Sequence, residues 1–218
     1  GCYAYYKELH MQHMLTGVTA RYPRLNNTYR FDSGDNRSIK CDPFDEGAAY
    51  EMSFVMSDDT AKELHTLCME AYKNASALDT KRKWPDKPTL LPYKRDENGV
   101  VVGKCKLKGS YGGEKTHPPK QVDAARNKLP DDFMLTTDSK CNVAVVIVPF
   151  NSGSINGVSL RLRAVQVLEL AEVQGSDDPF SSVDGGYTAS ATPPSDDPFG
   201  LPAAAPAPAN DLDDEIPF

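Results

Sequence analysis

Two strand-like runs joined by a short loop decide the fold: NVAVVIVPF (142–150), NSGSING (151–157) and VSLRLRAVQVLELAEV (158–173). Stretches rich in Val, Ile and Leu are typical of strands. A Gly- and Asn-rich segment between two such runs predicts a β-hairpin. The other elements of the chain are expected to build on this antiparallel pair.

Three further segments are expected to form strands, and one a helix. Residues 50–56 alternate large apolar with smaller or polar side chains, as a half-buried strand does, and 101–111 is expected to be another strand. Residues 17–24 and 28–32 predict one or two strands before them. Acidic residues open a helical pattern over 58–75. Its predicted buried face consists of Leu64, Leu67, Cys68, Ala71 and Ala75.

Five strands with one helix inserted early predict an all-β protein, namely a small closed or nearly closed antiparallel β-barrel. A β-sandwich is the alternative, although it would usually have more strands. The polar, proline-containing residues 76–99 are expected to be an irregular connection. The barrel domain is expected to occupy residues 1–175.

The net charge of −7 is divided unevenly along the 218 residues. Residues 176–218 hold nine of the 31 acidic residues, none of the 24 basic ones and eight of the 17 prolines, so this tail carries −9 and residues 1–175 carry +2. A stretch such as PAAAPAPAN buries too little to offset the entropy of ordering it. We therefore expect a disordered acidic tail on a basic body, a pattern associated with nucleic-acid-binding proteins.

Several functional classes lack their sequence signals. No run approaches eighteen consecutive apolar residues and no signal-peptide pattern opens the sequence, so neither a membrane span nor secretion is expected. The five cysteines are widely spread without a C-x-x-C pair, which favours buried thiols in a reducing compartment. There is no G-x-S-x-G, P-loop, G-x-G-x-x-G or H-E-x-x-H pattern, so no catalytic residue, metal or cofactor is expected.

Basic residues recur at every second position in two of the expected strands. In the last strand Leu160, Leu162 and Leu168 are expected to point inward, which places the arginines on the opposite face. Residues 81–108 hold nine basic against three acidic residues. Such stripes predict a track for a phosphate backbone, and the alternative is a solvated strand face. The predicted members are Lys104, Lys106 and Lys108 in one strand, Arg161 and Arg163 in the other, and Arg82 in the connection.

Besides basic residues, a binding site for a single nucleic-acid strand requires aromatic side chains, because single-stranded bases stack on flat rings with little sequence preference. Phe150 is the most telling candidate, since it ends a strand after Pro149 and opens a polar loop. A place in the core is the alternative for each ring. The candidates near the basic stripes are Phe150, Tyr111, Trp84 and Tyr93.

The tail contains a repeat. SDDPF occurs at 176–180 and again at 195–199, and the chain ends DDEIPF at 213–218, so acids followed by Pro-Phe occur three times. A low-complexity solubilising tail explains the acids but not the recurring Pro-Phe. A phenyl ring beside carboxylates suits a basic-rimmed hydrophobic pocket on a partner protein. The predicted partner-binding residues are Asp213, Asp214, Glu215, Ile216, Pro217 and Phe218.

This ending resembles the acidic tip of bacterial single-stranded-DNA-binding proteins. The body, over residues 45–175, is instead similar to the single-stranded-DNA-binding proteins of tailed bacteriophages, an OB-fold family. The segments that carry this likeness are 50–57 leading into the helix, Lys87-Pro88, Leu91-Pro92-Tyr93, 104–111, 146–150 and 157–168. The resemblance implies that Phe150 stacks on a base and that Phe218 contacts replication proteins. It also implies the cytoplasm of an infected bacterial host as the location.

The expected function is therefore a non-catalytic protein that coats single-stranded DNA in phage DNA replication, recombination and repair. Its acidic tail would recruit polymerase, primase-helicase or nuclease, from the phage or from the host. The rival is an interaction protein, a decoy whose host-like tail captures host repair or replication enzymes, and a metal-dependent nuclease is a distant third. The sequence leaves the oligomeric state open, with a homodimer as one option.

Overall fold

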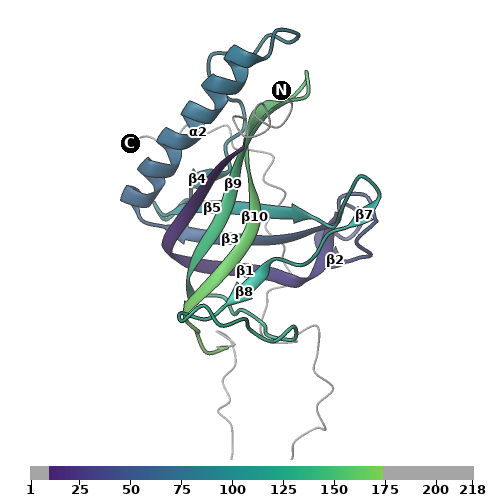
Figure 1. Ribbon diagram of the computed structural model, residues 1–218, viewed down its shortest axis with the longest axis vertical. Coiled ribbons are helices and arrows are strands. Elements are labelled where there is room, and N and C mark those ends of the chain that lie inside the picture. The colour runs from purple at the N-terminus through teal and green to yellow at the C-terminus, as the bar shows by residue number, and fades with distance from the viewer. Residues whose placement is uncertain (1–9, 174–218) are drawn as a thin grey trace, which may run out of the picture.

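A five-stranded barrel forms the centre of the computed structural model, which describes residues 10–173 (Figure 1). Its strands are β1 (Met11–Asp32), β3 (Ala49–Met56), β5 (Val101–Lys108), β9 (Lys140–Asn151) and β10 (Asn156–Glu169). They follow the order β5–β3–β1–β9–β10 with antiparallel neighbours, and a parallel pairing of β10 with β5 closes the circle. This topology confirms the predicted OB-fold.

One 22-residue strand stands where one or two strands were expected around 17–24 and 28–32, and it begins at Met11, six residues earlier than predicted. β1 pairs with β9 in its first half, with β3 in its second half, and with β2 (Arg37–Lys40) at its end. Register shifts interrupt these pairings, and Gly17 and Tyr22 have φ angles of +63° and +48°. Bulges bend and twist a strand, and this bending lets β1 pair with β9 along one part of its length and with β3 along another.

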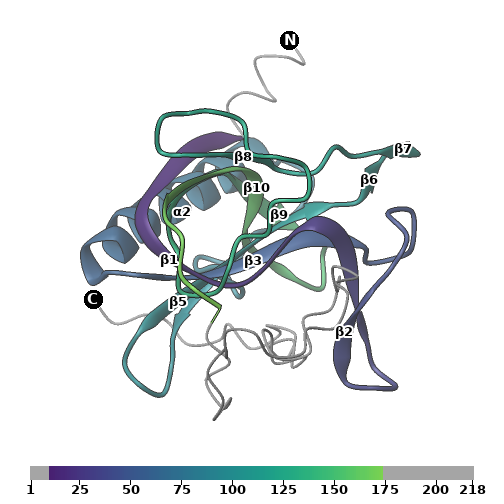
Figure 2. The same ribbon diagram turned by 90° about the horizontal axis from the view of Figure 1, so that it is seen from below.

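The helix α2 (Asp58–Leu78) follows β3 and lies at one end of the barrel (Figures 1 and 2). The side-chain oxygen of Ser57 accepts a hydrogen bond from the backbone N–H of Thr60 at 3.2 Å, which caps the first turn. The helix is three residues longer than predicted, and Leu67 is only partly buried. The buried residues of the helix are Ala61, Leu64, Cys68, Ala71, Tyr72 and Ala75.

A register shift in β10 corrects one prediction about the core. Leu160 and Leu162 are buried as expected, but the register against β9 shifts between Leu162 and Ala164. Such a shift exchanges the two faces of a strand. Val165 and Val167 therefore take the inward positions, and Leu168 is 41% exposed.

The connection after α2 is tied to the β9–β10 hairpin. Asn156 is buried, and its side-chain oxygen accepts hydrogen bonds from the backbone N–H and the hydroxyl of Thr89, both at 3.0 Å. Leu90 then pairs with Gly157, and β4 (Tyr93–Arg95) adds to the edge of β5. The expected irregular connection is thus partly a strand.

Three shorter strands complete the structure. β6 (Ser110–Tyr111) and β7 (Glu114–Lys115) form a small hairpin, and β8 (Lys120–Val122) pairs in parallel with β10. No helix among residues 10–173 is long and apolar enough to cross a membrane.

The expected buried thiols are confirmed for Cys68, Cys105 and Cys141, which are free, whereas Cys41 is partly exposed. Burial raises the pKa of Cys68 to about 12, which keeps this thiol protonated. Cys2 lies outside the described residues.

Gly103 gives a test of the barrel packing. A Cβ at this position would lie 2.4 Å from two ring carbons of Phe54, whose side chain is fully buried. We expect Gly103→Ala to lower the free energy of unfolding by about 1–3 kcal/mol because the ring has no space to move. Urea denaturation measures this, with Gly34→Ala as the control, since a Cβ there meets only the flexible Asp32 side chain at 3.6 Å or more. Equal midpoints for the two variants would contradict the packing described here.

Candidate nucleic-acid interface

A cleft of about 690 Å³ opens on the side of the barrel where β5 and β10 meet. The edge of β10 that is not paired with β9 pairs with three segments in turn: Leu90 pairs with Gly157, Lys106 with Arg161, and Lys120 with Ala164. β5 pairs with β10 in parallel at one register pair, Lys106 with Arg161. The lining from outside these strands includes Asp45, Gly47 and Ala48 of the loop before β3, as well as Leu90, Pro92 and Tyr111.

The structure places four of the predicted basic residues in this cleft. Lys104, Lys106 and Lys108 line it from β5, and Arg161 lines it from β10. The odd-numbered neighbours Gly103 and Cys105 face the core, which is the expected alternation. Because Lys106 is the register partner of Arg161, the two basic stripes meet at the seam of the barrel.

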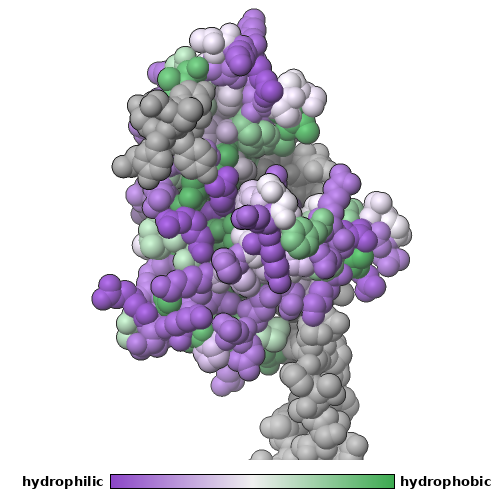
Figure 3. All heavy atoms as spheres, turned by 45° about the vertical axis from the view of Figure 1, so that its right-hand side comes forward, coloured by the Kyte–Doolittle hydropathy of each residue, from purple (hydrophilic) through white to green (hydrophobic). Residues whose placement is uncertain are grey.

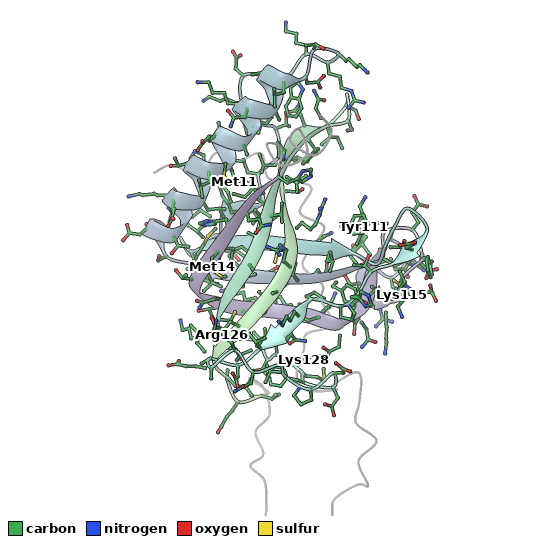
Figure 4. The ribbon with its side chains drawn as sticks, in the orientation of Figure 1. Met11, Met14, Tyr111, Lys115, Arg126 and Lys128 are labelled. Carbon is green, nitrogen blue, oxygen red and sulfur yellow. The ribbon has the colours of Figure 1, made fainter. Side chains whose placement is uncertain are left out.

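Tyr111 stands at the rim of the cleft, on the β6–β7 hairpin (Figure 4). The guanidinium of Arg161 lies 5.5 Å from the centre of its ring, and the Lys108 ammonium lies 5.9 Å from it. Cations over a ring face are attracted by its quadrupole and hold it in place. The ring is 41% exposed, so part of it remains available to a ligand.

Phe150 lines the cleft from β9 and is partly exposed. It stands opposite Gly157 in the hairpin, where the partner has no side chain. Even a Cβ at Gly157 would lie 2.1 Å from the Leu90 carbonyl oxygen, so glycine is required there. The cleft thus combines four cations with two aromatic rings of different strands.

Two predicted stacking residues lie outside the cleft lining, and the burial of Tyr93 corrects the prediction for that ring. Tyr93 is 1% exposed, and its hydroxyl lies 2.8 Å from Nδ1 of His65, so its ring belongs to the core. Trp84 donates a hydrogen bond from Nε1 to the Asp79 carboxylate at 2.8 Å and packs edge-on against Tyr72 at 5.1 Å. Trp84 does not line the cleft, because these contacts hold its ring against the C-terminal part of α2.

Two predicted basic residues also lie outside the cleft lining. Arg163 adjoins the register shift of β10, and its Nη1 donates a hydrogen bond to the side-chain oxygen of Gln12 at 2.7 Å. Arg161 and Arg163 were predicted to share one face of the strand, but only Arg161 lines the cleft. Arg82 donates a hydrogen bond to the backbone carbonyl of Asn151, next to Phe150.

One carboxylate of this cluster was not predicted from the sequence. Glu51 of β3 is the register partner of both Arg24 and Lys106, and its side chain is only 12% exposed. It lies 3.2 Å from Arg24 and 3.8 Å from each of Lys104 and Lys106. The charged side chain of Glu51 within the alternating strand 50–56 was the sequence feature that could have indicated its place in the cluster.

Burial is the largest influence on Lys104 and lowers the pKa of its ammonium. Glu51 opposes this effect, while the nearby charges of Lys106 and Arg24 add to it. The Glu51 carboxylate therefore stabilises the charged form of Lys104 against the effect of burial.

Figure 3 shows the side of the molecule that carries β2 and β7, where hydrophilic side chains predominate and hydrophobic ones lie between them. The lower end of the molecule, which bears Arg126 and Lys128 in Figure 4, is separate from the cleft lining. Among residues 10–173, no group of three or more His, Cys, Asp or Glu side chains is arranged to hold a metal ion. The predicted partner-binding residues 213–218 lie outside the described part of the chain.

The chain matches no protein-family model and no curated protein at a significant level. Its fold is similar to that of gp2.5, a single-stranded DNA-binding protein encoded by bacteriophage T7, with a TM-score of 0.58 and 19% identity over 83% of this chain and 100% of that one. It is also similar to the single-stranded DNA-binding protein of bacteriophage Enc34 in complex with ssDNA, with a TM-score of 0.53 and 16% identity over 76% of this chain and 89% of that one. At these identities the likeness establishes a shared fold.

The titration of Lys104 tests the charge arrangement of the cleft. We expect its pKa to lie below the ordinary 10.5, and Glu51→Gln to lower it further because the opposing charge is lost. NMR titration of ¹³C-methylated lysines measures both, with Lys104→Arg to assign the resonance. A Lys104 pKa that is unchanged by Glu51→Gln would contradict the described contact.

Proposed function

We propose that this chain binds and coats single-stranded DNA without catalysing a reaction on it. The observation that carries the proposal is the cleft at the β5–β10 seam, where four cations meet the rings of Tyr111 and Phe150. A positive groove with aromatic platforms is the arrangement that takes up a phosphate backbone together with unpaired bases. The shared fold with two phage proteins whose names state single-stranded DNA binding adds support.

In the proposed mechanism the phosphates follow Lys104, Lys106, Lys108 and Arg161, and the bases stack on Phe150 and Tyr111. Arg161 and Lys108 hold the Tyr111 ring before DNA arrives, so less conformational freedom is lost on binding. No base-edge readout is required, so sequence preference is weak.

The proposal extends to the acidic tail, on grounds of sequence alone. Its nine carboxylates would compete for the cleft until DNA displaces them, and the Pro-Phe ends would then bind replication or repair proteins. The proposed setting is phage DNA replication, recombination and repair in the cytoplasm of a bacterial host.

Fluorescence anisotropy with labelled oligo-dT and with its duplex tests the proposal. We expect tighter binding to the single strand, and an affinity that falls steeply between about 50 and 200 mM salt because bound phosphates release counter-ions. If neither form binds, the proposal is wrong and the decoy function of the tail becomes the better explanation. Magnesium-dependent cleavage of the labelled strand would instead indicate a nuclease.

In the same assay Phe150→Ala should weaken oligo-dT binding, since each stacked base contributes about 1–3 kcal/mol. Phe31→Ala is the matched control, because Phe31 is a 37% exposed phenyl on β1 that does not line the cleft. Equal losses for the two variants would remove Phe150 from the site.

Removal of residues 176–218 should tighten oligo-dT binding, because the competing charge of −9 is lost. The same truncation should abolish binding to replication proteins. Phe218→Ala in the full chain is the matched control, since it keeps the charge, and we expect its DNA affinity to equal that of the wild type. An unchanged DNA affinity in the truncated chain would rule out competition by the tail.

A further inference from the structure

The partly buried carboxylate of Glu51 lies against two of the cations that line the cleft. A row of outward-facing residues crosses four strands: Arg24 on β1, Glu51 on β3, Lys106 on β5 and Arg161 on β10, each the register partner of the next. Lys104 lies two residues along β5 on the same face. Glu51 is thus an anion in the middle of a basic surface that is proposed to bind another anion.

The two oxygens of Glu51 have different contacts. Oε1 accepts a hydrogen bond from Nη1 of Arg24 at 3.2 Å, and the exposed fractions of these side chains are only 12% and 8%. Oε2 lies 3.8 Å from the ammonium nitrogens of both Lys104 and Lys106, which is longer than a hydrogen bond. One oxygen is therefore fixed, whereas the other makes loose contacts that an incoming anion can replace.

The two lysines lie on the side of Glu51 that is open to the ligand. Both line the cleft, whereas neither Glu51 nor Arg24 does, and the Lys106 side chain is 54% exposed. Arg24 remains as the partner of Glu51 if the lysines turn to another anion. The buried carboxylate would then not be left without a compensating charge, which would be costly.

We propose that Glu51 is the internal counter-ion of this cleft: Oε2 holds Lys104 and Lys106 in the free protein, and a backbone phosphate takes its place when a strand binds. Glu51 is thus a positioning residue that holds two like-charged lysines together before binding. It also limits the affinity of the site, since each binding event must replace its contacts. The inference rests on the proposed binding of single-stranded DNA.

The test compares Glu51→Gln with the wild-type chain by oligo-dT anisotropy over a salt series. We expect several-fold tighter binding at low salt and a steeper plot of log affinity against log salt, because Glu51 no longer neutralises part of the charge of the two ammonium groups that meet the phosphates. In a Lys106→Gln background the effect of Glu51→Gln should shrink, because the competition is for that ammonium. Weaker binding or an unchanged slope in a folded variant would overturn the inference.

Asp131→Asn is the matched control. The Asp131 carboxylate also makes a loose contact with an ammonium group, at 3.7 Å from Lys128, but neither residue lines the cleft. Removal of the Asp131 carboxylate should leave the salt slope at the wild-type value, and a change equal to that of Glu51→Gln would show a general charge effect and overturn the inference.

If Glu51→Gln does not fold, the double variant Arg24→Gln, Glu51→Gln removes the buried pair together, and we expect the same steeper slope. An unchanged slope in the double variant would overturn the inference. A wild-type chain that does not bind oligo-dT would refute the proposed function itself, before any variant is compared.

Discussion

The parallel contact between β5 and β10 is the constraint on which the rest of the structure depends. It closes the barrel at one register pair, and this pair consists of two cations, Lys106 and Arg161. Like charges on directly opposed residues destabilise a sheet. Two cations at the register pair that closes the barrel are not what stability alone would favour. Such departures from stability are expected at functional sites. The carboxylate of Glu51, 3.8 Å from Lys106, offsets part of this repulsion.

The shape of the cleft follows from how the edge of β10 is shared. The connection after α2 occupies the upper part through Leu90, β5 the middle and β8 the lower part. Gly157 permits the close approach of Leu90. The side chain of the buried Asn156 fixes the same connection through the backbone N–H and the hydroxyl of Thr89, and it also contacts the Tyr72 hydroxyl of α2. These contacts fix the wall beside Phe150, so under the proposed function a stacked base would meet a preformed surface.

The interface and the core compete for the same kinds of side chain. Tyr93 and Trp84 satisfy their polar atoms inside the protein, through His65 and Asp79, and so contribute to stability. Tyr111 and Phe150 keep exposed area in the cleft, which costs stability and leaves ring surface for a ligand. The same division applies to the arginines, since Arg24 is buried against Glu51 whereas Arg161 faces the cleft.

The sequence by itself determined the local features. Period-two alternation placed Lys104, Lys106 and Lys108 on one face, helical spacing identified α2, and the Gly- and Asn-rich loop predicted the β9–β10 hairpin. Only the tertiary structure decided which strands are neighbours, where the register of β10 shifts and which rings are buried. These depend on contacts between residues far apart in the chain, such as Lys106 with Arg161 and Asn156 with Thr89, and local periodicity carries no information about such pairings.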